Sequence, residues 1–504
     1  MSREPAVQRL PRRSQFDTVV ENTGAGVGGE VADLGLRTLG SLLMARILGP
    51  AGLGSWLVAR TVAFDLSGIL ARCGLDEAAL RFVARSRGRH EPACARGVVS
   101  LASQWTLVTA VIAVVLILTG ASFIGGRVFG KPDVAYLMRV LAPSLLLWAP
   151  VTVFLAAVQG QDRVAIRVGG QKVAFPGVQA AVLALALAAG WGMRGVVGAH
   201  YLGVLATAVV AATAGLRAWR STVGSGEREC QKRELVSFAG PVALTELSTF
   251  VVLWIDILML GALSTRSEAG IYGATQRVAG LVALPLNAVN MMFSPMIAVL
   301  HGRGDTRGLG EMFRITTRWV LIASLPLFVL VIFGGTSILG LFGRDFQAGY
   351  AALALLSVGK LVSSATGSVG YMLNMTGHQR LNLLNSLILG VVNATLNALW
   401  IGRWGATGAA AASALSLGLV NVFRVIEVRA VLGLSLFSRG YVVALLGGLV
   451  GVLSVIALRG QLHGMIGGVA LGVVFLLVYC GVVAKWGIEC ADREAAAAAL
   501  RRIR

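Results

Sequence analysis

Apolar stretches of about 20 residues, each followed by a short polar break, recur along almost the whole chain. An α-helix of that length crosses a hydrocarbon core about 30 Å thick. The 504 residues are 56% hydrophobic and 13% charged, about half the charged fraction of a soluble chain. The pattern predicts an all-α polytopic membrane protein with about fourteen transmembrane helices. The predicted spans begin near Gly26, Leu53, Val98, Ala135, Ala174, Val196, Phe238, Ile271, Trp319, Ala351, Asn382, Thr407, Tyr441 and Ile466.

The net charge of +20 is interpreted as membrane topology rather than nucleic-acid binding. A cytoplasmic N-terminus assigns about 30 of the 44 Lys and Arg residues to cytoplasmic segments, as the positive-inside rule requires. We therefore expect a multi-pass protein of the inner (plasma) membrane with both termini in the cytoplasm. The basic breaks also favour contact with anionic lipid head groups of the bilayer.

Short patterns at the span junctions recur at offsets of 210 to 217 residues, which indicates a duplicated six-span unit. An even number of spans separates each pair, so the two copies have the same orientation in the membrane. The pairs are 54–56 with 270–272, 129–131 with 342–344, 160–163 with 377–380, and 195–199 with 405–409. The predicted domains are a cytoplasmic tail (1–25), a six-helix lobe (26–216), a cytoplasmic linker (217–236), a second six-helix lobe (237–440), two additional helices (441–486) and a cytoplasmic tail (487–504).

Charged residues inside the predicted spans are the candidate functional residues. A charge facing lipid at the bilayer centre costs about 2.5–3.5 kcal/mol, so these side chains are expected to face a wet cavity between the lobes. Four cations suit a phosphate or pyrophosphate, which Arg binds bidentately. They are Arg37, Arg60, Arg277 and Lys360, whereas Glu30, Asp33, Asp65, Glu246 and Asp256 are the candidate carboxylates for ion coupling or for lining the cavity.

The tenth span carries a polar stripe, and one alternative for the charged residues is open at the level of sequence. Lys360 begins a polar stripe in the tenth span that continues through Ser364, Gly367, Tyr371 and Asn374 at helical spacing. The alternative for each charged residue is an internal salt bridge that fixes helix packing, for example Asp33 with Arg37 at i+4.

Two stretches carry a likeness to a known family: Ala45 to Trp56 with Gly74-Leu75 and Arg81-Phe82, and Asp256 to Arg277. They resemble the polysaccharide flippases of the multidrug/oligosaccharidyl-lipid/polysaccharide exporter superfamily. The resemblance implies two lobes, alternating access, and export of polyprenyl-pyrophosphate-linked sugar units. Lipid II flippases of the same superfamily are similar in using central arginines, which implies substrate contacts for Arg37, Arg60 and Arg277.

We therefore expect a flippase for a polyprenyl-pyrophosphate-linked oligosaccharide, with no enzymatic activity, metal or cofactor. A polysaccharide polymerase and export machinery are candidate partners. A lipid II-type flippase and a multidrug or cation exporter are the alternatives within the superfamily. A polymerase or ligase is the alternative from another class, but the longest predicted external connection, residues 120–134, is too short for a catalytic platform.

Overall fold

The computed structural model describes residues 12–89, 91–223, 232–436, 438–458 and 464–487, and no strand occurs in these ranges. The predicted all-α fold class is confirmed. The α-helices are α1 (Arg12–Arg60), α2 (Ser67–Arg72), α3 (Leu75–Gly88), α4 (Pro92–Phe123), α5 (Pro132–Leu141), α6 (Leu145–Gln159), α7 (Val164–Val168), α8 (Phe175–Ala189), α9 (Gly192–Val210), α10 (Leu216–Thr222), α11 (Lys232–Leu263), α12 (Arg266–Ala279), α13 (Leu284–Gly302), α14 (Thr306–Phe342), α15 (Tyr350–Thr366), α16 (Val369–Met375), α17 (Gln379–Leu432), α18 (Arg439–Leu458) and α19 (Gly464–Val482).

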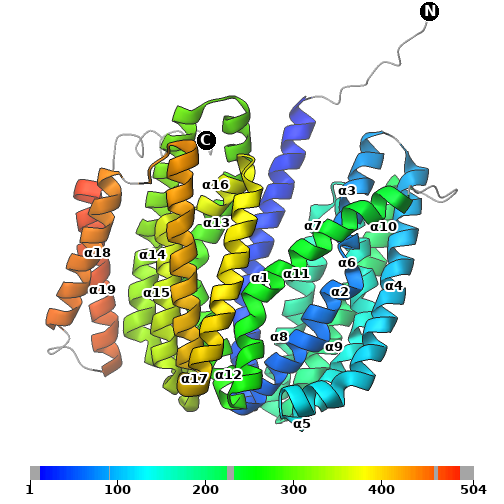
Figure 1. Cartoon of the computed structure of the whole chain (residues 1–504), viewed down its shortest axis with the longest axis horizontal. Coiled ribbons are helices and arrows are strands. Elements are labelled where there is room, and N and C mark those ends of the chain that lie inside the picture. Colours follow the sequence, from blue (N-terminus) through cyan, green and yellow to red (C-terminus); the bar gives the residue numbers. More distant parts are fainter. Residues whose placement is uncertain (1–11, 90, 224–231, 437, 459–463, 488–504) are drawn as a thin grey trace, which may run out of the picture. The chain divides into compact units, whose positions relative to one another are not determined.

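Short π- and 3₁₀-helical segments join several of these helices. The π-helical segments are η1 (Thr61–Leu66), η2 (Ile124–Val128), η4 (Gly169–Ala174), η5 (Ala211–Gly215) and η8 (Val483–Gly487), and the 3₁₀ segments are η3 (Ala142–Ser144), η6 (Gly280–Ala283) and η7 (Arg344–Gly349). Within each half of the chain the long helices run side by side (Figure 1).

The chain divides into two compact units, Met1–Val251 (unit 1) and Val252–Arg504 (unit 2). The division falls inside α11, so that helix contributes to both units. The predicted domain boundaries stay a prediction, because much of the terminal tails and of the linker at 217–236 lies outside the described residues. Where it is described, the predicted N-terminal tail is already helical, since α1 begins at Arg12.

Ten helical runs in the described ranges are long and apolar enough to cross a membrane. Two of them are interrupted by a glycine, Gly49 in α1 (φ 63°) and Gly405 in α17 (φ 51°). The 54 residues of α17 would extend about 80 Å at 1.5 Å per residue, more than twice the hydrocarbon thickness. The halves on either side of Gly405 therefore each have the length of one crossing. The predicted count of fourteen spans stays a prediction.

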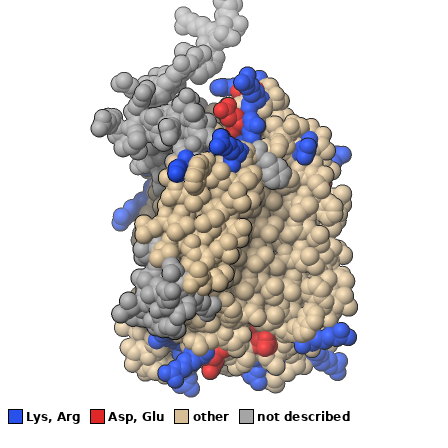
Figure 2. Space-filling view, turned by 90° about the vertical axis from the view of Figure 1, so that its left-hand side faces the viewer, with Lys and Arg blue, Asp and Glu red and all other residues tan. Residues whose placement is uncertain are grey.

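The surface of unit 2 around α18 has the character of a lipid-facing surface. Leu445, Leu449 and Leu453 repeat every four residues along α18 and are 43–55% exposed. Figure 2 shows a broad band of uncharged residues across the middle of this face, with Lys, Arg, Asp and Glu gathered toward its two ends. A surface with exposed leucines and an uncharged middle is stable next to lipid chains, which supports the multi-pass assignment.

The predicted tenth span is a broken helix. α15 ends at Thr366, Gly367 adopts φ 69° and ψ −153°, and the short helix α16 follows. A Cβ at Gly367 would lie 2.3 Å from the hydroxyl oxygen of Thr317, so both the backbone angle and the close approach require glycine. The predicted continuous polar stripe is therefore interrupted, and Ser364 is buried with its hydroxyl donating to the Val282 carbonyl at 3.4 Å.

Candidate functional site

A buried carboxylate with three hydrogen-bond donors forms the centre of a polar site in unit 2. Asp256 lies on α11 and is 5% exposed. One carboxylate oxygen accepts hydrogen bonds from the Tyr272 hydroxyl at 2.5 Å and from the Ser413 hydroxyl at 2.5 Å. The other oxygen accepts from the side-chain amide of Asn397 at 2.6 Å. Helices from three parts of unit 2 therefore converge on one carboxylate.

The two asparagines of α17 extend this network. Asn397 also donates to the side-chain oxygen of Asn393 at 2.9 Å, one helical turn away, and Asn393 donates to Ser413 at 3.3 Å. The remaining amide oxygen of Asn397 is buried and has no hydrogen-bond partner among the described residues. A buried acceptor without a partner is costly, so this oxygen has capacity for a further donor or a cation.

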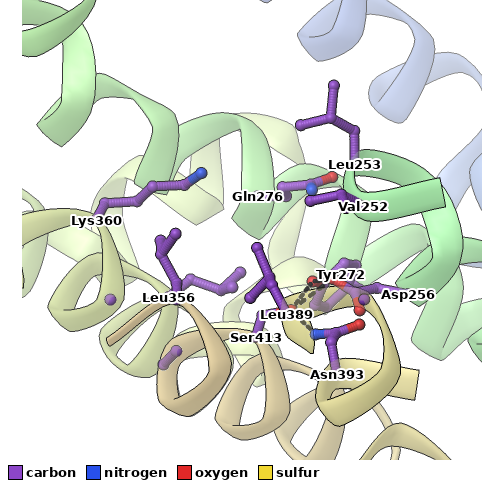
Figure 3. Close-up of a pocket in the computed structure, with 14 residues that line it drawn as sticks. Val252, Leu253, Asp256, Tyr272, Gln276, Leu356, Lys360, Leu389, Asn393 and Ser413 are labelled. Carbon is purple, nitrogen blue, oxygen red and sulfur yellow. Dashed lines mark hydrogen bonds between the residues drawn. The ribbon is translucent and has the colours of Figure 1, made fainter. Parts of the chain in front are cut away.

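A cavity of about 110 Å³ adjoins the Asp256 cluster. Figure 3 shows Asp256, Tyr272, Asn393 and Ser413 together in its wall, whereas Lys360 enters from α15 with its amine toward Gln276. The rest of the wall is mainly aliphatic. The cavity thus combines an anionic cluster with a separate cation in an apolar setting.

The chemistry of the Asp256 cluster suits a proton or a monovalent cation. Its ligand atoms are carboxylate, hydroxyl and amide oxygens, which hard cations prefer, and it carries one formal negative charge. Among the described residues no group of three or more His, Cys, Asp and Glu side chains could hold a metal ion.

Unit 1 places most of its predicted charges in ion pairs. In the first half of α1, Arg37 pairs with Asp33 through Nε at 2.5 Å, and its guanidinium lies 5.8 Å from the centre of the Phe175 ring. Glu30 pairs with Lys172 of η4. The salt-bridge alternative therefore holds for Asp33 with Arg37. The Arg37 side chain nevertheless keeps 31% of its surface exposed.

The second half of α1 carries another pair. Arg60 lies 3.6 Å from a carboxylate oxygen of Asp65, which belongs to η1, and 5.9 Å from the centre of the Phe64 ring. Five predicted site residues of unit 1, together with Lys172, thus form three cation–carboxylate pairs. The positive and negative charges of these three pairs balance, so the pairs carry no net positive charge. An anionic ligand would instead contact the exposed part of each Arg side chain.

The other two predicted residues lie apart from these pairs. Glu246 belongs to the unit 1 end of α11 and lies 3.8 Å from Arg72 of α2. Arg277 is half-buried in the last turn of α12. Of the predicted set, the cavity in unit 2 contains only Asp256 and Lys360 among its described lining residues.

Sequence reasoning did not assign several residues of these sites. The missed residues are Arg72, Lys172, Tyr272, Asn393, Asn397 and Ser413. A signal existed for Asn393 and Asn397, because two amides at i and i+4 in an apolar helix share one face and need polar partners. Ser413 carries no such signal, because its partner lies 157 residues away in the chain.

A family model described as "Polysaccharide biosynthesis protein" matches residues 19–301, more than half of the chain. The chain belongs to the polysaccharide biosynthesis protein family. The resemblance noted in the sequence is confirmed. The model of a second family, MatE, matches residues 241–399, which include Asp256, Tyr272, Lys360 and both asparagines of the polar cluster.

Two relatives of this polysaccharide biosynthesis protein come from Haloferax volcanii. This chain is 23% identical over 191 residues to "Probable low-salt glycan biosynthesis flippase Agl15" and 29% identical over 197 residues to "Probable flippase AglR". Each alignment covers 38% of this chain, and 40% and 41% of the respective relatives. The similarity therefore spans about two fifths of these relatives' length.

Solved structures of low sequence identity share the fold. The lipid II flippase MurJ in an inward closed conformation superposes with a TM-score of 0.71 at 12% identity, covering 92% of this chain and 98% of MurJ. An inward-facing MATE-family transporter gives a TM-score of 0.68 at 16% identity, covering 79% and 94%. A MOP-superfamily transporter from Pyrococcus furiosus gives 0.59 at 13% identity, covering 82% and 95%. This polysaccharide biosynthesis protein therefore has the fold of MOP-superfamily transporters.

Proposed function

We propose that this protein is a flippase that moves a polyprenyl-pyrophosphate-linked oligosaccharide from the cytoplasmic to the outer leaflet by alternating access, without a catalytic step. One observation carries the proposal within the family: Arg37 lies in an apolar span, paired with Asp33, and still has 31% of its side chain exposed. An arginine side chain that stays partly accessible inside a membrane protein is a costly feature, and its guanidinium has the geometry to bind a pyrophosphate bidentately.

The arginine–carboxylate pairs support release as well as binding. A pyrophosphate that reaches Arg37 or Arg60 displaces a carboxylate that already neutralises the guanidinium, so binding exchanges one anion for another. Such an exchange avoids leaving a bare buried charge before the cargo arrives or after it leaves, which would cost several kcal/mol. We assign Arg277 and Lys360 to the same anionic cargo, as further cations of the predicted substrate site.

The driving force has two candidate sources in this proposal. An interior-negative membrane potential favours outward movement of an anion by about 2.3 kcal/mol per charge per 100 mV. Asp256 is the carboxylate we assign to ion coupling, because its oxygen-rich cluster adjoins a cavity. Glu30, Asp33, Asp65 and Glu246 then serve as partners of nearby cations.

The setting of the flippase follows from the charge pattern. We place it in the inner (plasma) membrane with both termini in the cytoplasm, where the carrier lipid receives its sugars. The polyprenyl chain stays in the bilayer while the head group passes along the protein. A polysaccharide polymerase and export machinery are the partners that this role implies, and nucleic acid is not among them.

A multidrug or cation exporter is the second candidate function. The match of the MatE model over residues 241–399 and the anionic Asp256 cluster beside an apolar cavity favour it. An organic cation would bind at Asp256 and would not require Arg37. A lipid II-type flippase would use the same arginines as our proposal and would differ only in the sugars of its cargo.

Reconstitution in liposomes tests the proposal. The full-length protein is assayed with polyprenyl-pyrophosphate lipids carrying a labelled glycan, with lipid II, and with an organic cation. We expect faster movement of the glycan lipid than in empty liposomes, and at least a tenfold loss in Arg37→Gln, about the worth of one charge-assisted hydrogen bond. The control Arg194→Gln changes an exposed arginine at the start of α9 and should behave as wild type. Transport of the organic cation alone would favour the exporter.

A further inference from the structure

A second polar cluster in unit 2 has no role in the transport steps described so far. It lies where α16 turns into α17, and none of its residues lines the cavity beside Asp256. Its members come from α16 and from both halves of α17: Asn374, Asn382, Asn385, Ser386, Arg424 and Glu427. Arg424 lies nine residues before the helix end at Gly433, a depth of roughly 13 Å along the axis.

Hydrogen bonds hold the members of this cluster side by side. Asn382 donates to the side-chain oxygen of Asn374 at 2.9 Å. Asn385 donates to a carboxylate oxygen of Glu427 at 2.6 Å, and Arg424 donates to the Ser386 hydroxyl at 3.2 Å. The cluster is therefore a built arrangement of amides, a hydroxyl, a guanidinium and a carboxylate.

The cluster nevertheless leaves hydrogen-bonding capacity unused. The Nε of Arg424 and the amide oxygen of Asn382 are buried without a partner among the described residues. Arg424 and Glu427 lie less than one turn apart on α17 and interact electrostatically, but among the described residues no direct ion pair within 4.0 Å joins the guanidinium to a carboxylate. A guanidinium and a carboxylate inside a span are costly unless they are paired or bind a ligand. Packing alone does not account for this arrangement.

We propose that this cluster binds the sugars of the lipid-linked cargo, and this inference rests on the proposed flippase function. A sugar hydroxyl both donates and accepts a hydrogen bond, and neighbouring hydroxyls match planar amide, guanidinium and carboxylate groups placed together. The carboxylate of Glu427 would repel a phosphate, so the cluster is unsuited to the pyrophosphate. Tyr371 is 41% exposed on α16, one turn before Asn374, and offers a ring face for stacking against a pyranose.

The broken helix supports the same assignment. Transporters place discontinuous helices where the backbone lines a binding region, because unpaired backbone groups are not tolerated against lipid. The break at Gly367 and Ser368 immediately precedes α16, which carries Tyr371 and Asn374. Gly370 of α16 lies beside Arg424, because a Cβ built at this glycine would be 3.7 Å from the guanidinium carbon, an ordinary contact distance.

The test compares binding of two lipids that differ only in their sugars. Full-length protein in detergent is titrated with polyprenyl pyrophosphate and with polyprenyl pyrophosphate carrying a defined oligosaccharide. The variants are Glu427→Leu, Arg424→Gln and Tyr371→Ala, with Tyr371→Phe as the ring-retaining control. Arg429→Gln is the matched control, because Arg429 is an exposed arginine on the same helix outside the cluster. Melting temperatures of all variants report folding.

We expect Glu427→Leu and Arg424→Gln to weaken binding of the sugar-bearing lipid about tenfold, roughly one charge-assisted hydrogen bond, and to leave the sugar-free lipid within about twofold. Equal losses for both lipids, or wild-type binding of both by all folded variants, would overturn the sugar site while the flippase proposal stands. A wild-type protein that binds neither lipid in detergent and moves neither lipid in the liposome assay would overturn the flippase proposal itself.

Discussion

Replacing Asp256 by Asn separates the charge of the unit 2 site from its shape. Asparagine has the same size as aspartate, and its oxygen can still accept from Asn397. Its amide nitrogen would face the hydroxyls of Tyr272 and Ser413, which can turn and accept instead of donating. The fold is therefore expected to survive while the formal charge disappears.

The hydrogen bonds to Asp256 set the expected changes in stability and in cation affinity. Three hydrogen bonds to a charged group weaken by about 1 kcal/mol each when the group becomes neutral, but the carboxylate no longer has to be desolvated, which returns several kcal/mol. The free energy of unfolding should thus change by no more than about 2 kcal/mol. A bound cation about 4 Å away loses roughly 4 kcal/mol at an effective dielectric constant of 20, or about a thousandfold in affinity.

The assay is glycan-lipid translocation in liposomes under an imposed sodium or proton gradient. Wild-type protein should move the lipid faster with one of these gradients, and Asp256→Asn should lose that acceleration. Glu268→Gln is the matched control: Glu268 accepts the backbone N–H of Ala406 at 2.6 Å, at the Gly405 break and outside the cavity lining. This control should keep the gradient response.

A folded Asp256→Asn protein that responds to both gradients as wild type does would refute ion coupling at this carboxylate. Loss of the response in Glu268→Gln as well would show that any neutralised carboxylate has this effect. The assignment of the charge effect to the Asp256 cluster would then be wrong.

Three further outcomes are expected. Tyr272→Phe removes a fully buried hydroxyl that donates to Asp256, and should lower the free energy of unfolding by about 1–3 kcal/mol, seen as a lower melting temperature; an unchanged value would contradict the network. Asp33→Asn removes the carboxylate that pairs with Arg37 and should tighten binding of inorganic pyrophosphate about fivefold, a free-energy change of the size measured for exposed ion pairs. Weaker binding would mean that Asp33 orients the guanidinium. Gly74 has φ 72°, and a Cβ at this position would lie 2.4 Å from the carbonyl oxygen of Ala239, so Gly74→Ala should lower the free energy of unfolding by about 3 kcal/mol or more. Thermal unfolding measures this loss against the control Gly88→Ala, where a Cβ meets nothing within 4 Å.

Part of the fold was predictable because it depends on solvent preference along the chain. The helical class and the places where helices run follow from apolar length, since each crossing must satisfy its own backbone. The sequence did not show where helices break inside the membrane. The break at Gly367 depends on Thr317, some fifty residues earlier in the chain, approaching too closely for any side chain.

The candidate sites were predictable only in part. A charge in an apolar span is visible in the sequence, so Arg37, Arg60, Lys360 and Asp256 stand out. Their partners are not visible, unless they lie one turn away as Asp33 does from Arg37. Glu30 and Lys172 are separated by 142 residues, and no local pattern joins them.

The sequence by itself determined that this chain is an all-α membrane protein with ionisable groups inside its spans, because hydrophobic length and the cost of buried charge are local properties. Only the tertiary structure decided which groups neutralise one another and which keep unused hydrogen-bonding capacity. The Asp256 cluster is the clearest case: Tyr272 and Ser413 lie 16 and 157 residues away in the chain, and packing of α11, α12 and α17 brings their hydroxyls to one carboxylate. Such convergence depends on how helices pack, which no single segment encodes.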